Sequence, residues 1–250
     1  MRKTLTAMIL LLFSVILVSS IPNAHTSPDT YTFQPPTGDN RILSAGGAEY
    51  NYGATTAVTV GADNTPWTHR AILKFDMSSQ IPAGATINLA TLSLYYYSYG
   101  PFNNPQGRTY WAYRLTSTNW VEGTANGATQ TGSSDWNHQQ HTSVSWTTAG
   151  GDWTTTDGAS TTVPSSYDWM SWTVTAQVQY AVDNVGRVAH FLIKDGTETS
   201  SYNGFFYSKE NANANKPKLY VEWTSNAAPT NDQLSLDLTG ASYKGTKTLL

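Results

Sequence analysis

Short runs in which apolar and polar residues alternate constrain the fold of this chain more than any other feature. They cover residues 70–76, 91–97, 110–115, 189–194 and 218–223. In the first run, for example, Lys74 stands between Leu73 and Phe75. Because successive side chains of a strand point to opposite faces of a sheet, each run predicts one face in a core and one face outside it.

Helical periodicity is almost absent outside one segment. A short helix is expected from Thr175 to about Val182, with Thr175 as its cap, and Asp183-Asn184 would end it. Turn residues separate the alternating runs, and residues 123–143 read as a long polar excursion. The pattern therefore predicts an all-β sandwich or barrel.

Composition narrows the class of protein further. The chain has no cysteine, so an exported domain would rely on its core, with or without a metal ion, and not on disulfides. Only 12% of the residues are charged, whereas Trp (9) and Tyr (15) are abundant. Aromatic side chains are favoured in β-strands because they fit a pleated surface. The net charge is −3 and no basic stripe is present, which argues against a nucleic-acid partner.

The two ends of the chain predict its location and organisation. Arg2 and Lys3 precede an apolar run over residues 5–18, and small residues follow, so residues 1–24 are expected to be a signal peptide cleaved after Ala24 or Ser20. An uncleaved anchor is the alternative; the run is shorter than the about 20 residues of a membrane span. Residues 25–224 would form one monomeric domain. Residues 225–250 would be a linker and the start of a further domain, or else a short unpacked tail. The expected location is extracellular, secreted or cell-surface.

The outward faces of the strands are the first candidate for a ligand site. The residues expected in the core are Leu73, Phe75, Leu92, Leu94, Tyr113, Phe191 and Ile193. The opposite faces would then share aromatic and basic side chains, namely Arg70, Lys74, Tyr95, Tyr97, Tyr110, Arg114, His190 and Lys194. Aromatic rings suit the C–H faces of sugars and Arg pairs with carboxylates, so these residues predict a groove for an acidic glycan. The alternative is a sheet whose outward side chains are only solvated or paired with acids.

The tryptophans expected in loops also have two possible interpretations. Trp67, Trp136 and Trp153 lie in polar segments and are either sugar platforms or lids over the core. We expect three further tryptophans, Trp120, Trp146 and Trp172, inside the core.

Metal binding is the next possibility. Glu122 and Asp152 are the candidate ligands of a structural Ca²⁺, with Asp135 and Asp157 flanking similar turns. Solvated turn acids are the alternative. Zinc is not expected because Cys is absent and the histidines are scattered, and the spacing of His138 and His141 reads as incidental.

Catalysis is the least favoured class. Glu122 and Asp152 could be cast as the two carboxylates of a glycoside hydrolase, and His190 with Tyr95 as the groups of a polysaccharide lyase. No nucleophile elbow, zinc-protease motif or phosphate loop occurs in the sequence.

Several segments in a fixed order resemble the DNRLRE domain, which is grouped with carbohydrate-binding module family 96. They lie between residues 29 and 223 and include 29–31 (DTY), 51–53 (NYG), 70–76 (RAILKFD), 81–87, 120–123 (WVEG), 144–146 (VSW), 208–210 (SKE) and 216–219. The resemblance implies a jelly-roll-like antiparallel β-sandwich that binds polysaccharides, including acidic ones such as alginate, without catalysis. Longer stretches at 97–108 and 120–146 depart from the family pattern, which leaves the ligand open. A structural or adhesive surface domain is the alternative function.

Overall fold

The computed structural model describes residues 28–63, 67–101, 103–198 and 201–225. The predicted signal peptide and nearly all of the predicted linker lie outside these residues. The elements are β1 (Asp29–Phe33), β2 (Gly38–Leu43), η1 (Ala45–Gly47), β3 (Ala57–Ala62), β4 (Thr68–Asp76), β5 (Thr86–Tyr99), β6 (Thr109–Leu115), β7 (His138–Gln140), β8 (Val144–Ser145), β9 (Trp153–Thr162), β10 (Trp169–Thr173), α1 (Thr175–Asn184), β11 (Val188–Asp195), β12 (Tyr202–Tyr207) and β13 (Lys218–Thr224).

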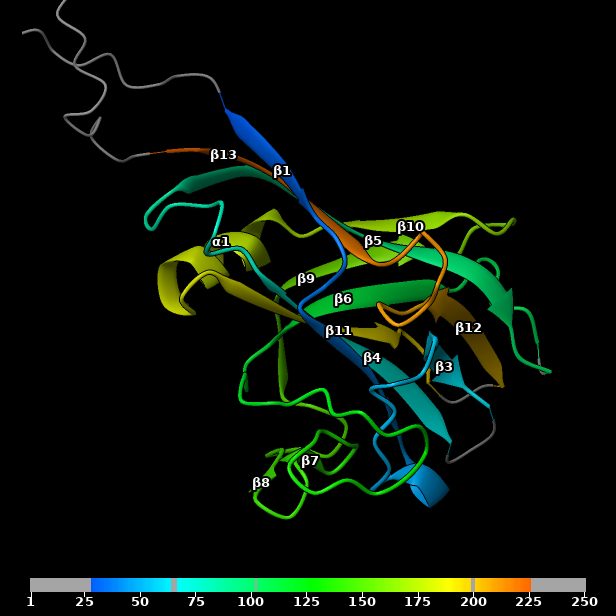
Figure 1. Cartoon of the computed structure of the whole chain (residues 1–250). Helices are drawn as coiled ribbons and strands as arrows, with labels where there is room; N and C mark the ends of the chain where they lie inside the picture. Colours follow the sequence, from blue (N-terminus) through cyan, green and yellow to red (C-terminus); the bar gives the residue numbers. More distant parts are fainter. Residues whose placement is uncertain (1–27, 64–66, 102, 199–200, 226–250) are drawn as a thin grey trace, which may run out of the picture. The chain divides into compact units, whose positions relative to one another are not determined.

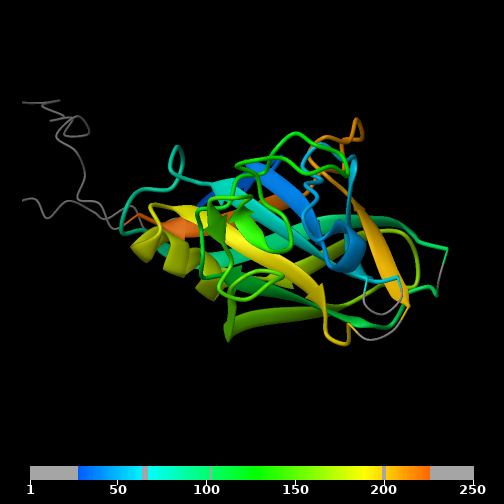
Figure 2. The ribbon, with the colours of Figure 1, turned by 90° about the horizontal axis from the view of Figure 1, so that it is seen from below.

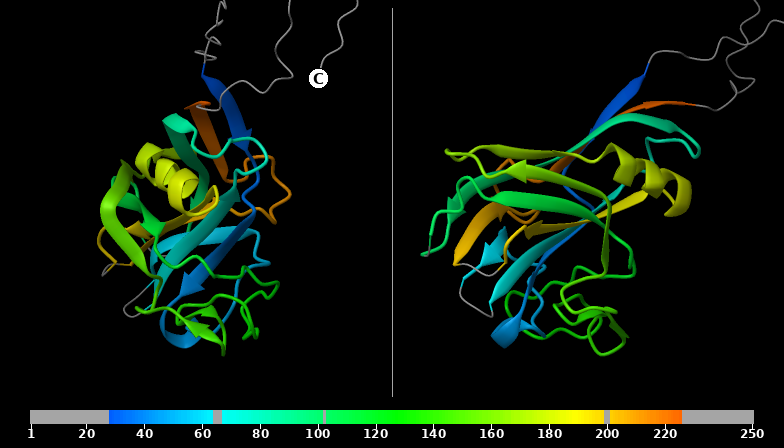
Figure 3. Two further views of the ribbon diagram at one scale, coloured as in Figure 1. Left: turned by 90° about the vertical axis from the view of Figure 1, so that its left-hand side faces the viewer. Right: turned by 180° about the vertical axis from the view of Figure 1, so that it is seen from behind.

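Eleven of the strands belong to one antiparallel sheet (Figure 1). Its order is β1-β13-β5-β12-β3-β4-β11-β6-β9, with β10 added beside β5 and β2 beside β4. The sheet curls until its two halves face each other (Figure 3). The prediction of an all-β sandwich with one short helix is therefore confirmed, and its two layers are parts of one continuous sheet.

The main core fills the space inside the curl. Leu73 and Phe75 on β4, Leu92 and Leu94 on β5, and Phe191 on β11 are all at most 1% exposed, as their alternation predicts. Burying these apolar side chains supplies most of the driving force for closing the two halves. Trp172 adds its ring to this core, as expected.

Helix α1 covers one end of the core with Val178, Ala181 and Val182. The expected helix is confirmed, but its cap is not: the N-cap residue is Val174, and the Thr175 hydroxyl oxygen accepts a hydrogen bond from the Ala90 N–H at 3.0 Å. Within the described ranges, no helix combines the length and the apolar character that crossing a membrane requires.

A second core lies on the outer face of β4, β11 and β6. Ile72 and Leu192 point away from the main core. Trp120 and Trp146 cover them; both belong to the segment between β6 and β9 (residues 116–152), which includes the polar stretch 123–143 and is called the excursion below. Figure 2 shows the excursion between β6 and β9 lying over these strands. Trp120 and Trp146 are buried as predicted, Trp136 and Trp153 pack partly buried beside them, and Trp67 is 40% exposed.

Strand β6 has the opposite orientation to the one expected. Tyr110 and Ala112 enter the main core, whereas Tyr113 and Leu115 belong to the second core. The run 110–115 carries apolar or aromatic residues at both parities, so alternation alone did not identify the inward face.

Candidate functional site

A row of aromatic side chains lies on the outer face of the other half of the sheet. On β5, Tyr95 and Tyr97 point away from the core while Tyr96 points into it. Trp169 on β10 is the direct cross-strand neighbour of Tyr95. We call this surface the tyrosine face; it consists of Tyr95, Tyr97, Trp169, Tyr207 and Lys218.

The rings of the tyrosine face hold one another in place. The Tyr207 ring stacks on Tyr97 with centroids 4.3 Å apart and planes 4° apart, and on Tyr95 at 5.7 Å and 13°. Trp169 meets Tyr95 edge-on at 5.4 Å. Because stacked faces cover each other, the row presents ring edges and phenol hydroxyls to a ligand, in a preorganised arrangement. All four aromatic residues are half-buried.

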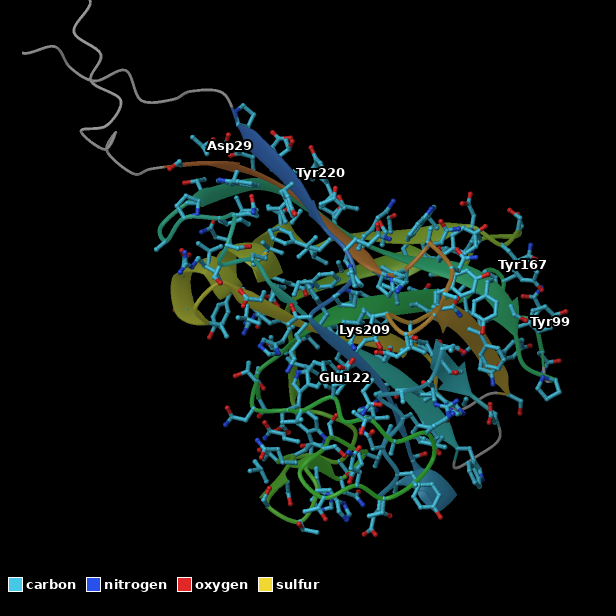
Figure 4. The ribbon with its side chains drawn as sticks, viewed as in Figure 1. Asp29, Tyr99, Glu122, Tyr167, Lys209 and Tyr220 are labelled. Carbon is cyan, nitrogen blue, oxygen red and sulfur yellow. The ribbon has the colours of Figure 1, made fainter. Side chains whose placement is uncertain are left out.

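The electrostatics of the tyrosine face suit hydrogen bonding. Burial, and secondarily the neighbouring Tyr207 phenol, raises the pKa of Tyr97, so its hydroxyl keeps its proton and can donate. Lys218 places Nζ 3.9 Å from the centre of the Trp169 ring, and no salt bridge to Lys218 occurs in the part of the chain that is described. Two exposed tyrosines, Tyr99 and Tyr167, lie toward the same end of the sheet (Figure 4).

The expected cationic residues of β4 and β11 do not extend this surface. Arg70 forms a two-pronged ion pair with Glu198, with Nε–Oε1 at 2.8 Å and Nη2–Oε2 at 2.9 Å. Its Nη1 also donates to the Gly150 carbonyl at 2.7 Å. Lys194 pairs with the same Glu198 at 3.0 Å. Glu198 therefore neutralises the charges of Arg70 and Lys194 beside the second core. The prediction of one outward groove shared by all of these residues is wrong.

Lys74 and His190 lie under the excursion and not on an open face. Lys74 Nζ donates to the Trp120 carbonyl at 3.2 Å and lies 4.5 Å from the centre of the Trp120 ring. The Trp120 Nε1–H donates to His190 Nδ1 at 3.0 Å, and His190 is 8% exposed. Burial, together with the positive charge of Lys74, lowers the pKa of His190 to about 4.

This histidine predicts a specific loss of stability in acid. The unfolded chain takes up a proton on His190 below the ordinary pKa of 6.5, whereas the folded chain does so only near pH 4. The contribution of neutral His190 to the free energy of unfolding is therefore fully present above pH 6.5 and is lost as the pH falls from 6.5 to 4. The expected loss is about 3 kcal/mol. His190→Asn keeps an acceptor for Trp120 but does not titrate, so urea unfolding between pH 7 and 4 should show a flatter pH dependence for this variant. Identical slopes for both proteins would contradict the prediction.

Two further candidates occupy other places. Tyr110 is fully buried, and its hydroxyl donates to the Val60 carbonyl at 3.0 Å, so it is a core residue and its expected outward position is wrong. Arg114 pairs with Asp157 at 2.7 Å and lies 3.6 Å from the centre of the Tyr180 ring of α1. Of the eight expected ligand residues, only Tyr95 and Tyr97 therefore lie together on the tyrosine face.

Glu122 belongs to a cluster of three carboxylates that alternation did not predict. Asp39, Glu122 and Glu210 bring oxygens within 4.8 Å of one another (Glu122 and its neighbour Lys209 are labelled in Figure 4). Lys209 Nζ pairs with Glu122 at 3.0 Å and with Glu210, while its backbone N–H donates to Asp39 at 2.8 Å. Burial raises the pKa of Asp39 well above its ordinary value, and it also raises that of Glu122. The Lys209 ammonium supplies the positive charge that a calcium ion would bring.

Asp152 does not join this cluster. Its carboxylate accepts hydrogen bonds from the Thr147 and Thr148 N–H groups at 2.9 and 2.7 Å and from the Ser117 hydroxyl at 2.8 Å. These contacts lower the pKa of Asp152 although its burial opposes them. Donors surround this carboxylate, so the expected pairing of Glu122 with Asp152, as calcium ligands or as a catalytic pair, is not formed.

The lyase pair is not formed either. Tyr95 belongs to the tyrosine face on β5, whereas His190 of β11 is buried against Trp120, and three strands of the sheet separate β5 from β11.

Antiparallel double-sheet folds occur in lectin domains, among other classes of protein. Residues 30–134 match the family model of carbohydrate-binding module family 96. The chain therefore contains a domain similar to that family, as the resemblance indicated, and Tyr95 and Tyr97 lie in the matched part. No match to the chain was found among curated proteins.

Proposed function

We propose that this chain is a non-catalytic module of a secreted or cell-surface protein and that it binds a polysaccharide along the tyrosine face. The single observation behind the proposed site is the stacked row of Tyr97, Tyr207 and Tyr95, which continues to Trp169 across adjacent strands. A row of hydroxyls that runs across adjacent strands fits an extended chain of sugars better than a single sugar.

An acidic polysaccharide such as alginate is the proposed ligand class. The support is narrower than the sequence suggested, because Arg70, Arg114 and Lys194 are each paired with an acid. Lys218 beside Trp169 is the cation that a uronate carboxylate would meet, together with the phenol hydroxyls.

Loss of the tyrosine row is expected to weaken binding. Tyr207→Ala removes the ring that stacks on both neighbours and should raise the Kd for alginate oligosaccharides at least about tenfold, as removal of a central aromatic contact commonly does. Tyr97→Phe keeps the stacking and removes one hydroxyl, so its Kd should rise roughly threefold to tenfold. Calorimetric titration measures both, and circular dichroism checks that each variant is folded.

The controls separate the competing functions. Tyr50→Ala removes a ring that is 40% exposed outside the tyrosine face and should leave binding unchanged. Lys218→Met should weaken binding of alginate and leave binding of a neutral glucan unchanged if a carboxylate is recognised. Absence of binding to any polysaccharide by the folded wild type would favour a structural or adhesive domain, and release of shortened products from alginate would favour an enzyme.

A further inference from the structure

The excursion over the second core brings together three side chains that are spaced three residues apart. Asp135 precedes the β7–β8 hairpin, His138 begins β7, and His141 follows β7. His141 Nδ1 lies 2.7 Å from Asp135 Oδ2. His138 Nδ1 lies 2.9 Å from Asp135 Oδ1 and 3.1 Å from Oδ2. The histidines that looked incidental in the sequence thus meet at one carboxylate oxygen.

The backbone holds this carboxylate in position. The Asn137 and His138 N–H groups donate to Asp135 Oδ1 at 2.8 and 2.7 Å, which orients Oδ2 toward the two imidazoles. The Trp146 indole N–H donates to the Asp135 carbonyl at 2.9 Å and ties the turn to the second core. The three groups are therefore preorganised on a packed part of the fold (the β7–β8 hairpin in Figure 1).

Among the described residues, the charged partners of Asp135 do not include a Lys or an Arg. Asp135 is 1% exposed, and the described part of the chain contains no Lys or Arg salt bridge to it. A buried carboxylate normally has a cationic partner or a metal ion. The His138 side chain is 20% exposed, which gives an ion a route to the cluster.

We propose that Asp135, His138 and His141 form a binding site for a divalent transition-metal ion of the Zn²⁺ type. The ligand atoms are Asp135 Oδ2 and the two Nδ1 atoms, and water would complete a tetrahedral site. Bonds of about 2.0 to 2.1 Å place tetrahedral ligands roughly 3.3 Å apart, so the distances from Asp135 Oδ2 to His138 Nδ1 (3.1 Å) and to His141 Nδ1 (2.7 Å) are within about 0.6 Å of that spacing. An imidazole that binds the ion through Nδ1 carries its proton on Nε2.

The donor set decides which ion is expected. Two imidazole nitrogens with one carboxylate suit Zn²⁺, Co²⁺, Ni²⁺ or Cu²⁺, whereas Ca²⁺ and Mg²⁺ require mostly oxygen ligands. The site does not depend on the polysaccharide proposal, because none of its residues belongs to the tyrosine face.

The experiment uses the full chain after treatment with a chelator and dialysis. Calorimetric titration with Zn²⁺ should show one ion per chain, and the Tm should rise by roughly 5 to 10 °C when free Zn²⁺ is about 100 times the Kd. Co²⁺ should produce the visible absorption of a tetrahedral complex, and Ca²⁺ at the same concentration should change neither signal.

The variants assign the site to these residues. His138→Gln and His141→Gln should each weaken Zn²⁺ binding at least tenfold and abolish the Co²⁺ absorption. His69→Gln is the matched control, because His69 pairs with a single acid, Asp63, at 3.0 Å; it should bind as the wild type does. If a variant fails to fold, the wild-type stoichiometry, Co²⁺ spectrum and Ca²⁺ comparison still decide the matter. No uptake of Zn²⁺ or Co²⁺ by the wild type, or full uptake by both glutamine variants, would overturn the proposal.

Discussion

Trp120→Ala is expected to lower the free energy of unfolding by about 3 to 5 kcal/mol, as large core truncations do. Trp120 is 1% exposed and fills the second core, which the excursion forms against β4, β6 and β11. The same substitution removes the indole N–H bond to His190 and leaves that buried ring nitrogen without its donor. Urea unfolding followed by circular dichroism measures the loss.

Trp67→Ala is the control for a tryptophan in a loop. Its ring is 40% exposed, so the loss should stay under about 1 kcal/mol. A similarly small loss for Trp120→Ala would mean that the excursion is not packed against the sheet. The outer face of β4 and β11 would then be open, contrary to the burial of Lys74 and His190 described above.

Lys209→Met is expected to cost roughly 3 kcal/mol, because it removes the ammonium from a partly buried group of three carboxylates. Lys209 Nζ lies 3.0 Å from Glu122 Oε2 and also pairs with Glu210. The Lys209 backbone N–H keeps its bond to Asp39, so the variant isolates the charge. Urea unfolding at pH 8 measures the effect.

The pH dependence distinguishes a charge effect from lost packing. The pKa values of Asp39 and Glu122 are raised in the folded protein, so as the pH falls the folded chain takes up protons before the unfolded chain does. Protonation removes the repulsion that Lys209 no longer balances, so the loss in Lys209→Met should shrink between pH 8 and 5. Lys218→Met removes a cation that has no acidic partner among the described residues, and it should cost under about 1 kcal/mol at either pH. An equal loss for Lys209→Met at both pH values would contradict the charge explanation.

Much of the fold was predictable from local pattern. The alternation on β4, β5 and β11 correctly assigned their core residues because these strands have one clearly apolar parity. The failure on β6 has the same origin, since both of its parities are apolar or aromatic. A signal for the second core was present as well: Ile72 and Leu192 interrupt the polar parity of their strands, and an apolar residue on a supposedly outward face indicates that something covers it.

The candidate site was predictable only in part. Tyr95 and Tyr97 follow from alternation on one strand, but Tyr207 and Trp169 reach them through pairing with β12 and β10, which lie more than seventy residues away along the chain. The acidic partners of Arg70 and Arg114 could not be predicted from the sequence either. Arg70 meets Glu198 and Arg114 meets Asp157 because of the order of strands and the course of the loops.

Period-two alternation and the turn residues between the runs were sufficient for the five strands β4, β5, β6, β11 and β13 and for the all-β class, because these depend on neighbours in the chain. Strands such as β9, β10 and β12 lie outside the alternating runs. Which outward faces stay open, which charges are neutralised, and whether Asp135, His138 and His141 meet depend on segments far apart or on the exact path of a loop. Burial and ion pairing act through space over a few ångströms, so the folded arrangement of the sheet and its excursion settles them.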